Sequence, residues 1–125
     1  MAANQEVVRK FIEAVNANDK QRILSFFDDE SVFHNIPMEP ARGRDAIWAI
    51  LAIVHDHSEQ VDWVVHNIAQ AENGHVLTER TDRYRMGGRW VEFPVMGIFE
   101  VRDGTIREWR DYFDLKQCTD QMPDA

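Results

Sequence analysis

The second half of the chain, from residue 61 to residue 115, contains four consecutive strand patterns joined by short turns. The expected strands are Val61–Ile68, His75–Met86, Arg89–Arg102 and Thr105–Leu115. The turn signals between them are Glu72-Asn73-Gly74, Gly87-Gly88 and Asp103-Gly104, which favour tight hairpins. Successive strands joined by hairpins pair antiparallel, so this half of the chain is predicted to form a meander.

Two of these strands are about 13 residues long, which favours a strongly curved sheet over a flat one. Gly97 lies in the middle of a long strand, where glycine is typical of a bend or a bulge. The curvature would give the sheet a concave side that other elements can cover.

The first half of the chain is mainly helical by pattern. Apolar residues recur at helical spacing over residues 4–18, again around Ile23–Phe27, and over Asp45–His57, while Ser31–Ile36 reads as a strand. Helices early and strands late predict an α+β fold: a cone with a curved, mixed or antiparallel sheet of about six strands. Three to four helices from the N-terminal half would close it around an interior pocket. We expect residues 1–125 to form a single domain, with a polar, frayed tail after Cys118.

Composition excludes several classes of partner. The formal net charge of −8 argues against binding to nucleic acid, whose phosphates would be repelled. No apolar run is long enough to span a membrane, and the N-terminal sequence lacks the layout of a signal peptide. With one cysteine, Cys118, an intrachain disulfide is impossible, so a cytoplasmic location is expected. The five histidines show no metal-binding spacing, so neither a metal nor another cofactor is expected.

The strand VLTERTDRY, residues 76–84, carries charges on both faces. Alternation places Arg80 and Asp82 on one face, and Glu79 and Arg83 on the other. A half-buried sheet normally keeps one face apolar, so one of these charged pairs is expected to face a functional pocket.

Two further polar residues stand where apolar ones are usual. Asp111 alternates with Trp109 and Phe113 in the last strand, and Asn35 lies in the strand Ser31–Ile36 of the first half. Two carboxylates bridged by one arginine could hold different protonation states, one serving as general acid and the other as general base. An arginine–aspartate network that only stabilises the fold is the alternative interpretation of the same residues.

The segments FHNIPMEP, RGRDAI, VLTERTD, PVMGIFEV and WRDYFDL, in this order, resemble the limonene-1,2-epoxide hydrolase family. That family belongs to the cone folds similar to nuclear transport factor 2, which include SnoaL-like polyketide cyclases and ketosteroid isomerases. The resemblance implies that Asp111 takes a proton from the hydrolytic water and that Asp82 protonates the epoxide oxygen. It also implies that Arg80 lies between the two carboxylates and that Asn35 helps to hold the water. The family has a tyrosine where this chain has Phe33, which cannot hydrogen-bond.

The resemblance implies an epoxide hydrolase that forms a vicinal diol from a small apolar or cyclic epoxide, without a cofactor or a covalent intermediate. Apolar side chains are expected to line the substrate pocket: Phe33, Trp63, Phe93, Val95 and Trp109. Met96 and Ile98 would leave apolar surface on the far side of the sheet, which predicts a homodimer. The alternatives are an isomerase or cyclase of the same fold, and a binding module without catalytic activity. Mutual contact of Arg80, Asp82 and Asp111 would favour the hydrolase.

Overall fold

The computed structural model describes residues 3–123. In chain order, the helices and strands are α1 (Ala3–Asn16), α2 (Lys20–Leu24), β1 (Val32–Asn35), β2 (Ala41–Arg42), α3 (Arg44–His55), β3 (Gln60–Gln70), β4 (Val76–Met86), β5 (Arg89–Arg102), β6 (Thr105–Tyr112) and α4 (Leu115–Thr119). The strands form one six-stranded sheet in the order β2-β1-β6-β5-β4-β3. The predicted α+β class is confirmed.

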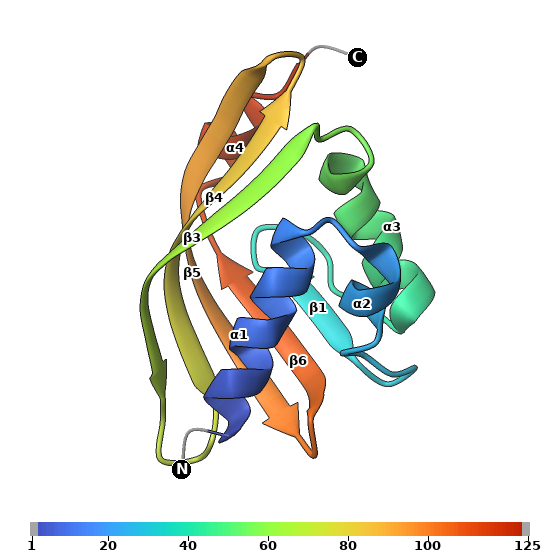
Figure 1. Ribbon diagram of the computed structural model, residues 1–125, viewed down its shortest axis with the longest axis vertical. Coiled ribbons are helices and arrows are strands. Elements are labelled where there is room, and N and C mark those ends of the chain that lie inside the picture. Colours follow the sequence, from blue (N-terminus) through green and yellow to red (C-terminus); the bar gives the residue numbers. More distant parts are fainter. Residues whose placement is uncertain (1–2, 124–125) are drawn as a thin grey trace.

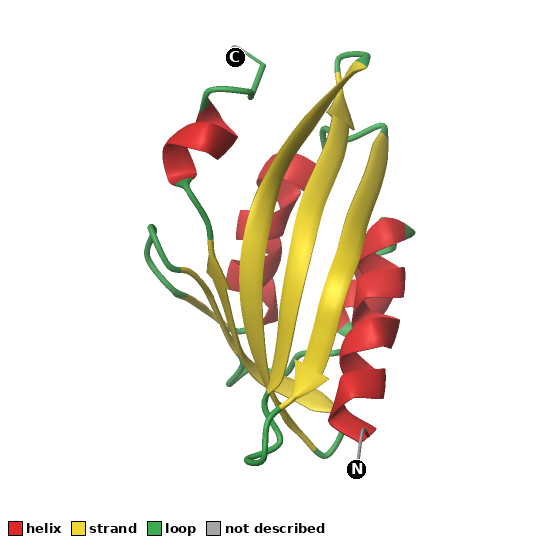
Figure 2. Ribbon diagram, turned by 90° about the vertical axis from the view of Figure 1, so that its left-hand side faces the viewer, coloured by secondary structure: helices red, strands yellow, loops and turns green. Residues whose placement is uncertain are grey.

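Helices α1, α2 and α3 lie together on one side of the curved sheet (Figure 1). The long strands β3, β4 and β5 show their other side to the viewer in Figure 2, with no helix in front of them. Helix α1 packs against the sheet because its apolar residues share one face, and its buried side chains are Val8, Phe11, Ile12, Ala14 and Val15. None of the helices within residues 3–123 is long and apolar enough to cross a membrane.

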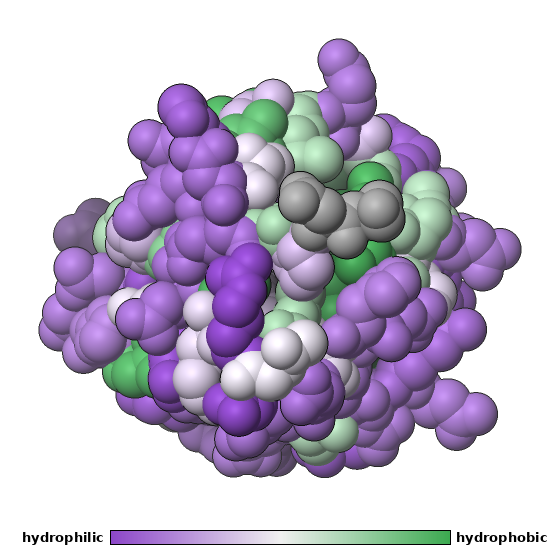
Figure 3. All heavy atoms as spheres, turned by 90° about the horizontal axis from the view of Figure 1, so that it is seen from above, coloured by the Kyte–Doolittle hydropathy of each residue, from purple (hydrophilic) through white to green (hydrophobic). Residues whose placement is uncertain are grey.

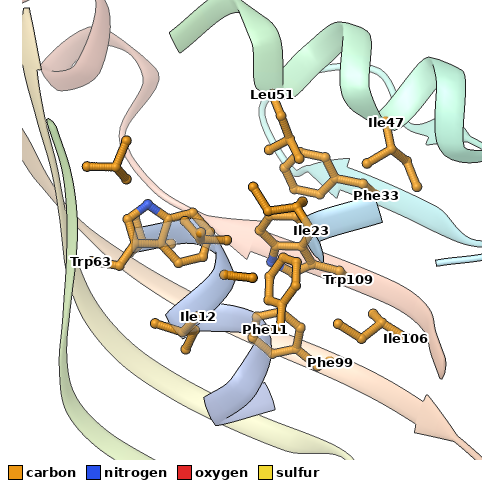
Figure 4. Packing of buried hydrophobic residues seen from close by; sticks show 14 of the residues in the cluster. Phe11, Ile12, Ile23, Phe33, Ile47, Leu51, Trp63, Phe99, Ile106 and Trp109 are labelled. Atoms are coloured by element: carbon orange, nitrogen blue, oxygen red, sulfur yellow. The ribbon is translucent and has the colours of Figure 1, made fainter. Parts of the chain in front are cut away.

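The aromatic core lies between the helices and the concave side of the sheet. Figure 4 shows Trp109, from β6, between Phe33, from β1, and Phe11, from α1. The Trp109 indole stacks on the Phe33 ring with 3.8 Å between ring centroids, and it meets the Phe11 ring edge-on at 5.2 Å. Because aromatic side chains bury large apolar areas, this cluster holds β1, β6 and α1 in fixed positions.

The first strand joins the sheet beside the last one. β1 runs parallel to β6, and this register sets Phe33 beside Trp109 and Asn35 beside Asp111. The other neighbouring strands pair antiparallel, so the sheet is mixed. The parallel pairing matters for the site, because it brings a residue from the helical half of the chain next to the last strand.

The structure has no β-bulge at Gly97, so this part of the prediction for Gly97 is wrong. Gly97 pairs in regular register with Thr78 on β4 and with Asp111 on β6. Register shifts occur elsewhere, between Val65 and Asn67 on β3 and between Glu100 and Val101 on β5. Irregularities of this kind bend a strand and increase its twist, so they contribute to the curvature of the sheet.

The C-terminal segment is more ordered than the sequence predicts. The last strand ends at Tyr112, short of the predicted Leu115, and α4 follows with Asp114 as its N-cap. The polar tail is not frayed at Gln121, whose side chain donates a hydrogen bond to the Glu92 carbonyl at 2.7 Å and accepts one from the Glu92 N–H at 3.0 Å. The fourth helix therefore comes from the C-terminal end of the chain, whereas the sequence placed all helices in the N-terminal half. Residues 124–125 lie outside the described residues.

Candidate active site

Arg80 is the centre of a buried ionic network on the concave side of the sheet. Its Nε and Nη2 groups donate to the two carboxylate oxygens of Asp82, both at 2.9 Å. Nη2 also donates to Asp111 Oδ2 at 2.9 Å, and Nη1 donates to Asp111 Oδ1 at 3.3 Å and to Thr78 Oγ1 at 3.0 Å. The guanidinium lies over the Trp63 ring, 4.3 Å from its centroid. All five N–H donors of Arg80 therefore have an acceptor, as a buried arginine requires.

The two faces of β4 place the charged pairs of VLTERTDRY in different surroundings. Arg80 and Asp82 are 1% and 2% exposed and face the helices. On the other face, Arg83 donates to Asp62 and to Glu92, both at 2.8 Å, across the partly exposed outer side of the sheet. The inward pair thus forms the buried network, and the outward arginine makes surface ion pairs.

Asp111 receives hydrogen bonds from two side chains. In addition to Arg80, the indole Nε1–H of Trp109 donates to Asp111 Oδ1 at 2.7 Å. The backbone of Asp111 is held as well, because its carbonyl accepts from the Ile36 N–H at 2.9 Å. Asn35 lies beside Asp111 in the register and lines the cavity described below, and none of the described residues hydrogen-bonds its side-chain amide. That amide is available to a small molecule held next to Asp111.

Gly97 lets the network approach the backbone of β5. A Cβ atom at this position would lie 2.5 Å from Arg80 Nη1 and 2.5 Å from Asp111 Oδ1. Both distances are well below van der Waals contact, so a larger residue would force these groups to move. The glycine of PVMGIFEV is therefore required by close packing and not by backbone conformation.

Burial and the arginine act in opposite directions on the pKa of Asp82. Removal from water and, to a smaller extent, the charge of Asp111 raise the pKa of this carboxyl, whereas the charge and hydrogen bonds of Arg80 lower it. The net result is a pKa of about 6. Burial alone would lower the pKa of Arg80, but Asp111 and Asp82 more than offset this effect, so the guanidinium stays charged. The network therefore contains a permanent cation and a carboxyl that takes up a proton in mildly acidic conditions.

A cavity of about 190 Å³ lies next to the network. Asp82, Asp111 and Asn35 supply polar groups to its wall, and all five predicted substrate-binding residues line it: Phe33, Trp63, Phe93, Val95 and Trp109. Helices α3 and α4 cover the cavity with Leu51 and Cys118, among others. Figure 3 views the molecule from above, and hydrophobic surface gathers near the middle of this face within a hydrophilic surround. The cavity suits a small, mainly apolar molecule.

The structure brings together the residues predicted for the site. Arg80, Asp82 and Asp111 are in mutual contact through the guanidinium, and Asn35 lines the same cavity. Sequence reasoning missed the wall formed by α4 and the polar contacts of Thr78, Trp109 and Tyr84. The parity of VLTERTDRY places Thr78 and Tyr84 on the same face as Arg80, and this signal could have identified them.

Comparisons with known proteins agree with this geometry. The family model of the limonene-1,2-epoxide hydrolase catalytic domain matches residues 2–123. The chain belongs to the limonene-1,2-epoxide hydrolase family. The epoxide hydrolase EphG of Mycobacterium tuberculosis is 34% identical to this family member over 108 residues, which cover 86% of this chain and 71% of EphG.

Solved structures place the family member in its fold. The structure of an M. tuberculosis LEH-like epoxide hydrolase is 32% identical and has a TM-score of 0.78; the match covers 92% of this chain and 85% of that one. A protein of Shewanella putrefaciens described as a SnoaL-like polyketide cyclase has a TM-score of 0.85 at 17% identity, covering 97% of this chain and 96% of that one. The second likeness concerns the fold alone, and the predicted cone fold is thereby confirmed.

Phe33 occupies the position at which the sequence resemblance implies a tyrosine. Its ring has no polar atom, and it lies nearly parallel to the Trp109 indole, with 16° between the ring planes. The same indole donates its N–H to Asp111. Phe33 therefore supports the orientation of a group that holds Asp111, and it adds apolar surface to the cavity wall.

Proposed function

We propose that this family member opens a small apolar epoxide to a vicinal diol in one step, with Asp111 as the general base and Asp82 as the general acid. As a member of the limonene-1,2-epoxide hydrolase family, the chain is an epoxide hydrolase. The observation that carries the mechanism is the bridge by Arg80, which contacts both carboxylates at 2.9 Å at the wall of one apolar cavity. This bridge holds a base and an acid at fixed separation, as concerted ring opening by water requires.

In the proposed step, Asp111 removes a proton from a water molecule as its oxygen attacks an epoxide carbon. The bond from that carbon to the epoxide oxygen breaks, and Asp82 gives its proton to that oxygen. Asn35 is positioned to hold the water beside Asp111. The products are the diol, protonated Asp111 and ionised Asp82, and the cycle closes when the proton returns to Asp82 through solvent.

The hydrogen bonds of Asp82 are compatible with its role as an acid. Each carboxyl oxygen accepts one hydrogen bond from Arg80 and has a second lone pair. A proton on this second lone pair can be transferred to a molecule in the cavity without breaking the contact with the arginine. Asp82 lines the cavity, so the transfer needs no rearrangement of the sheet.

The size and lining of the cavity support a small substrate. Its volume of about 190 Å³ is below the roughly 300–1,000 Å³ of pockets for drug-sized ligands. Aromatic and aliphatic side chains form most of its wall, and no lysine or arginine is among the described residues that line it. We therefore propose a compact epoxide without a negative charge, such as a cyclic hydrocarbon epoxide.

The contact between the three charged residues argues against the two alternative functions. A carbon-acid isomerase needs only one base, whereas a second carboxyl joined to that base through a permanent cation suits water addition, in which a base and an acid act in the same step. A simple binding module would have no use for a carboxyl with a raised pKa, because burying this group without a reaction only costs stability.

Hydrolysis in heavy-oxygen water tests the one-step mechanism. A single turnover with excess enzyme should place the label directly in the diol, because the attacking oxygen comes from solvent. Mass spectrometry of the diol and of protein peptides makes the measurement. Label that enters an aspartate carboxyl before the diol would indicate an ester intermediate and contradict the proposal. An absence of diol from every epoxide tested would contradict the function itself.

The pKa of Asp82 gives the reaction a pH dependence of known sign. A general acid must be protonated, and a carboxyl with a pKa of about 6 is protonated in only about one tenth of molecules at pH 7. We therefore expect kcat/KM to fall about tenfold per pH unit above this pKa. The residual activity of Asp82→Asn should lack this alkaline decline. A rate that increases from pH 6 to pH 8 would contradict the role of Asp82 as the general acid.

We also propose that the chain forms a homodimer through the outer side of the sheet. Exposed hydrophobic side chains lie there on three adjacent strands: Leu77, Met96 and Tyr112 are 38%, 48% and 49% exposed, and Ile98 is half-buried beside them. A symmetric dimer would cover this surface. Light scattering at micromolar concentration should give twice the mass of one chain. A Met96→Glu variant should give a lower average mass, because a charge at the contact would weaken the dimer. A monomer mass for the wild type would contradict the dimer.

A further inference from the structure

Tyr84 is a polar residue of the cavity wall that the proposed mechanism does not use. It follows Asp82 by two positions on β4, so both side chains lie on the concave face. Tyr84 is 4% exposed and lines the same cavity as Asp82 and Asp111. Its ring contacts the His55 ring edge-on at 5.8 Å and stacks on the Phe93 ring at 6.2 Å, which fixes the direction of the phenol.

The hydroxyl oxygen of Tyr84 accepts a hydrogen bond from Trp63. The indole Nε1–H donates to Tyr84 Oη at 2.9 Å, and both groups are buried. Trp63 is itself held in place: its backbone exchanges two hydrogen bonds with the Asn16 side chain, at 2.7 and 3.3 Å, and its ring covers the Arg80 guanidinium. The phenol oxygen is therefore held by the indole N–H of Trp63, a residue whose own position is fixed by these contacts.

The proton of the Tyr84 hydroxyl has no acceptor among the residues that the structure describes. Burial raises the pKa of Tyr84 well above its usual value, so the group is a hydrogen-bond donor at any ordinary pH. A buried donor without a partner is unfavourable, and such groups in native proteins normally find one. Since Tyr84 lines the cavity, a molecule bound there can supply the acceptor.

The surroundings define the chemistry of that acceptor. The charged groups near the Tyr84 hydroxyl are Asp82, Asp111 and Arg80, and Arg80 is already paired with both carboxylates. A bound anion would therefore find no free cation among the described residues that line the cavity, and its burial would be costly. A neutral oxygen satisfies the hydroxyl without this cost. We propose that Tyr84 forms a second polar subsite, which binds an ether or carbonyl oxygen on the carbon skeleton of the epoxide.

This inference rests on the proposed function and narrows its substrate class. The epoxide oxygen is assigned to Asp82, and side chains two residues apart on a strand start roughly 7 Å from each other. We assign the acceptor for Tyr84 to another part of the substrate. A compact epoxide that carries one oxygen a few bonds from the ring would satisfy both groups at once.

Two epoxides of matched shape test the subsite. They are cyclohexene oxide and its analogue in which a ring methylene not attached to the epoxide is replaced by an ether oxygen. Tyr84→Phe should lower kcat/KM for the ether analogue about tenfold more than for cyclohexene oxide, because only the analogue loses a hydrogen bond. Disturbance of Trp63 by the substitution affects both substrates and cancels in the comparison. Equal losses, or no loss, would overturn the subsite.

A control and a binding measurement separate this inference from the proposed function. Tyr112→Phe removes a hydroxyl from the exposed outer side of the sheet, so it should leave the ratio of the two rates unchanged. If the wild type opens neither epoxide, the hydrolase proposal fails, and the subsite is then judged from binding of the two corresponding diols, measured by NMR titration. Tighter binding of the ether diol to the wild type, lost in Tyr84→Phe, supports the subsite, and equal binding overturns it.

Discussion

Asp111→Asn and Asp82→Asn should each lower kcat by about two to four orders of magnitude, the usual effect of removing a general base or a general acid. Asparagine preserves the shape of either side chain and can still accept a hydrogen bond from Arg80. It can neither take a proton from water nor protonate an epoxide oxygen. Steady-state rates of diol formation, measured with protein whose fold is checked by circular dichroism, provide the test.

The double variant should lose much less than the product of the two single effects. The carboxylates act through one arginine and in one step, so the step is already lost when either is replaced. An Asp62→Asn variant is a suitable control, because Asp62 pairs with Arg83 on the outer side of the sheet. Full activity in either single variant of the buried pair would remove that residue from the mechanism.

Gly97→Ala should lower kcat/KM by about a hundredfold without unfolding the protein. The added methyl group would lie 2.5 Å from both Arg80 Nη1 and Asp111 Oδ1, so these groups must shift away from β5. A misplacement of about 1 Å in a catalytic group costs on the order of a hundredfold in rate. Overpacking of the buried site should also lower the free energy of unfolding by roughly 1–3 kcal/mol.

Gly88→Ala is the matched control for the Gly97 variant. Gly88 lies in the turn between β4 and β5, and a Cβ there meets no atom within 4 Å. Its φ of +77° makes alanine unfavourable, so this variant should lose some stability and keep its activity. Urea denaturation and rates measured at a temperature where both variants are folded separate the two effects. Wild-type activity in Gly97→Ala would show that the close approach has no role in catalysis.

Prediction from sequence is strongest where it depends on the alternation within a single strand. VLTERTDRY places Arg80 and Asp82 on one face and Arg83 on the other, whatever the strand pairs with. The same alternation, applied to β6, puts Asp111 on the side of Trp109. The residues of the candidate site and the α+β class were therefore accessible before the structure.

The tertiary structure decided how these residues meet. The parallel pairing of β1 with β6 sets Asn35 beside Asp111, and no local pattern encodes a contact between segments so far apart in the chain. The packing constraint at Gly97 is hidden from local patterns for the same reason, because it comes from the side chains of two neighbouring strands. The short helix α4 has too few residues for a periodic signal, yet it closes the cavity.

The donor groups around the site divide in the same way. Alternation within the strand places Thr78, Arg80, Asp82 and Tyr84 on one face, because side-chain direction in a strand follows from local geometry. Which atoms they bind depends on packing. The Trp109 N–H donates to Asp111 and the Trp63 N–H donates to Tyr84, and both indoles pack against Phe11 of helix α1. Long-range packing therefore fixed the hydrogen bonds, and local periodicity fixed the residues available to make them.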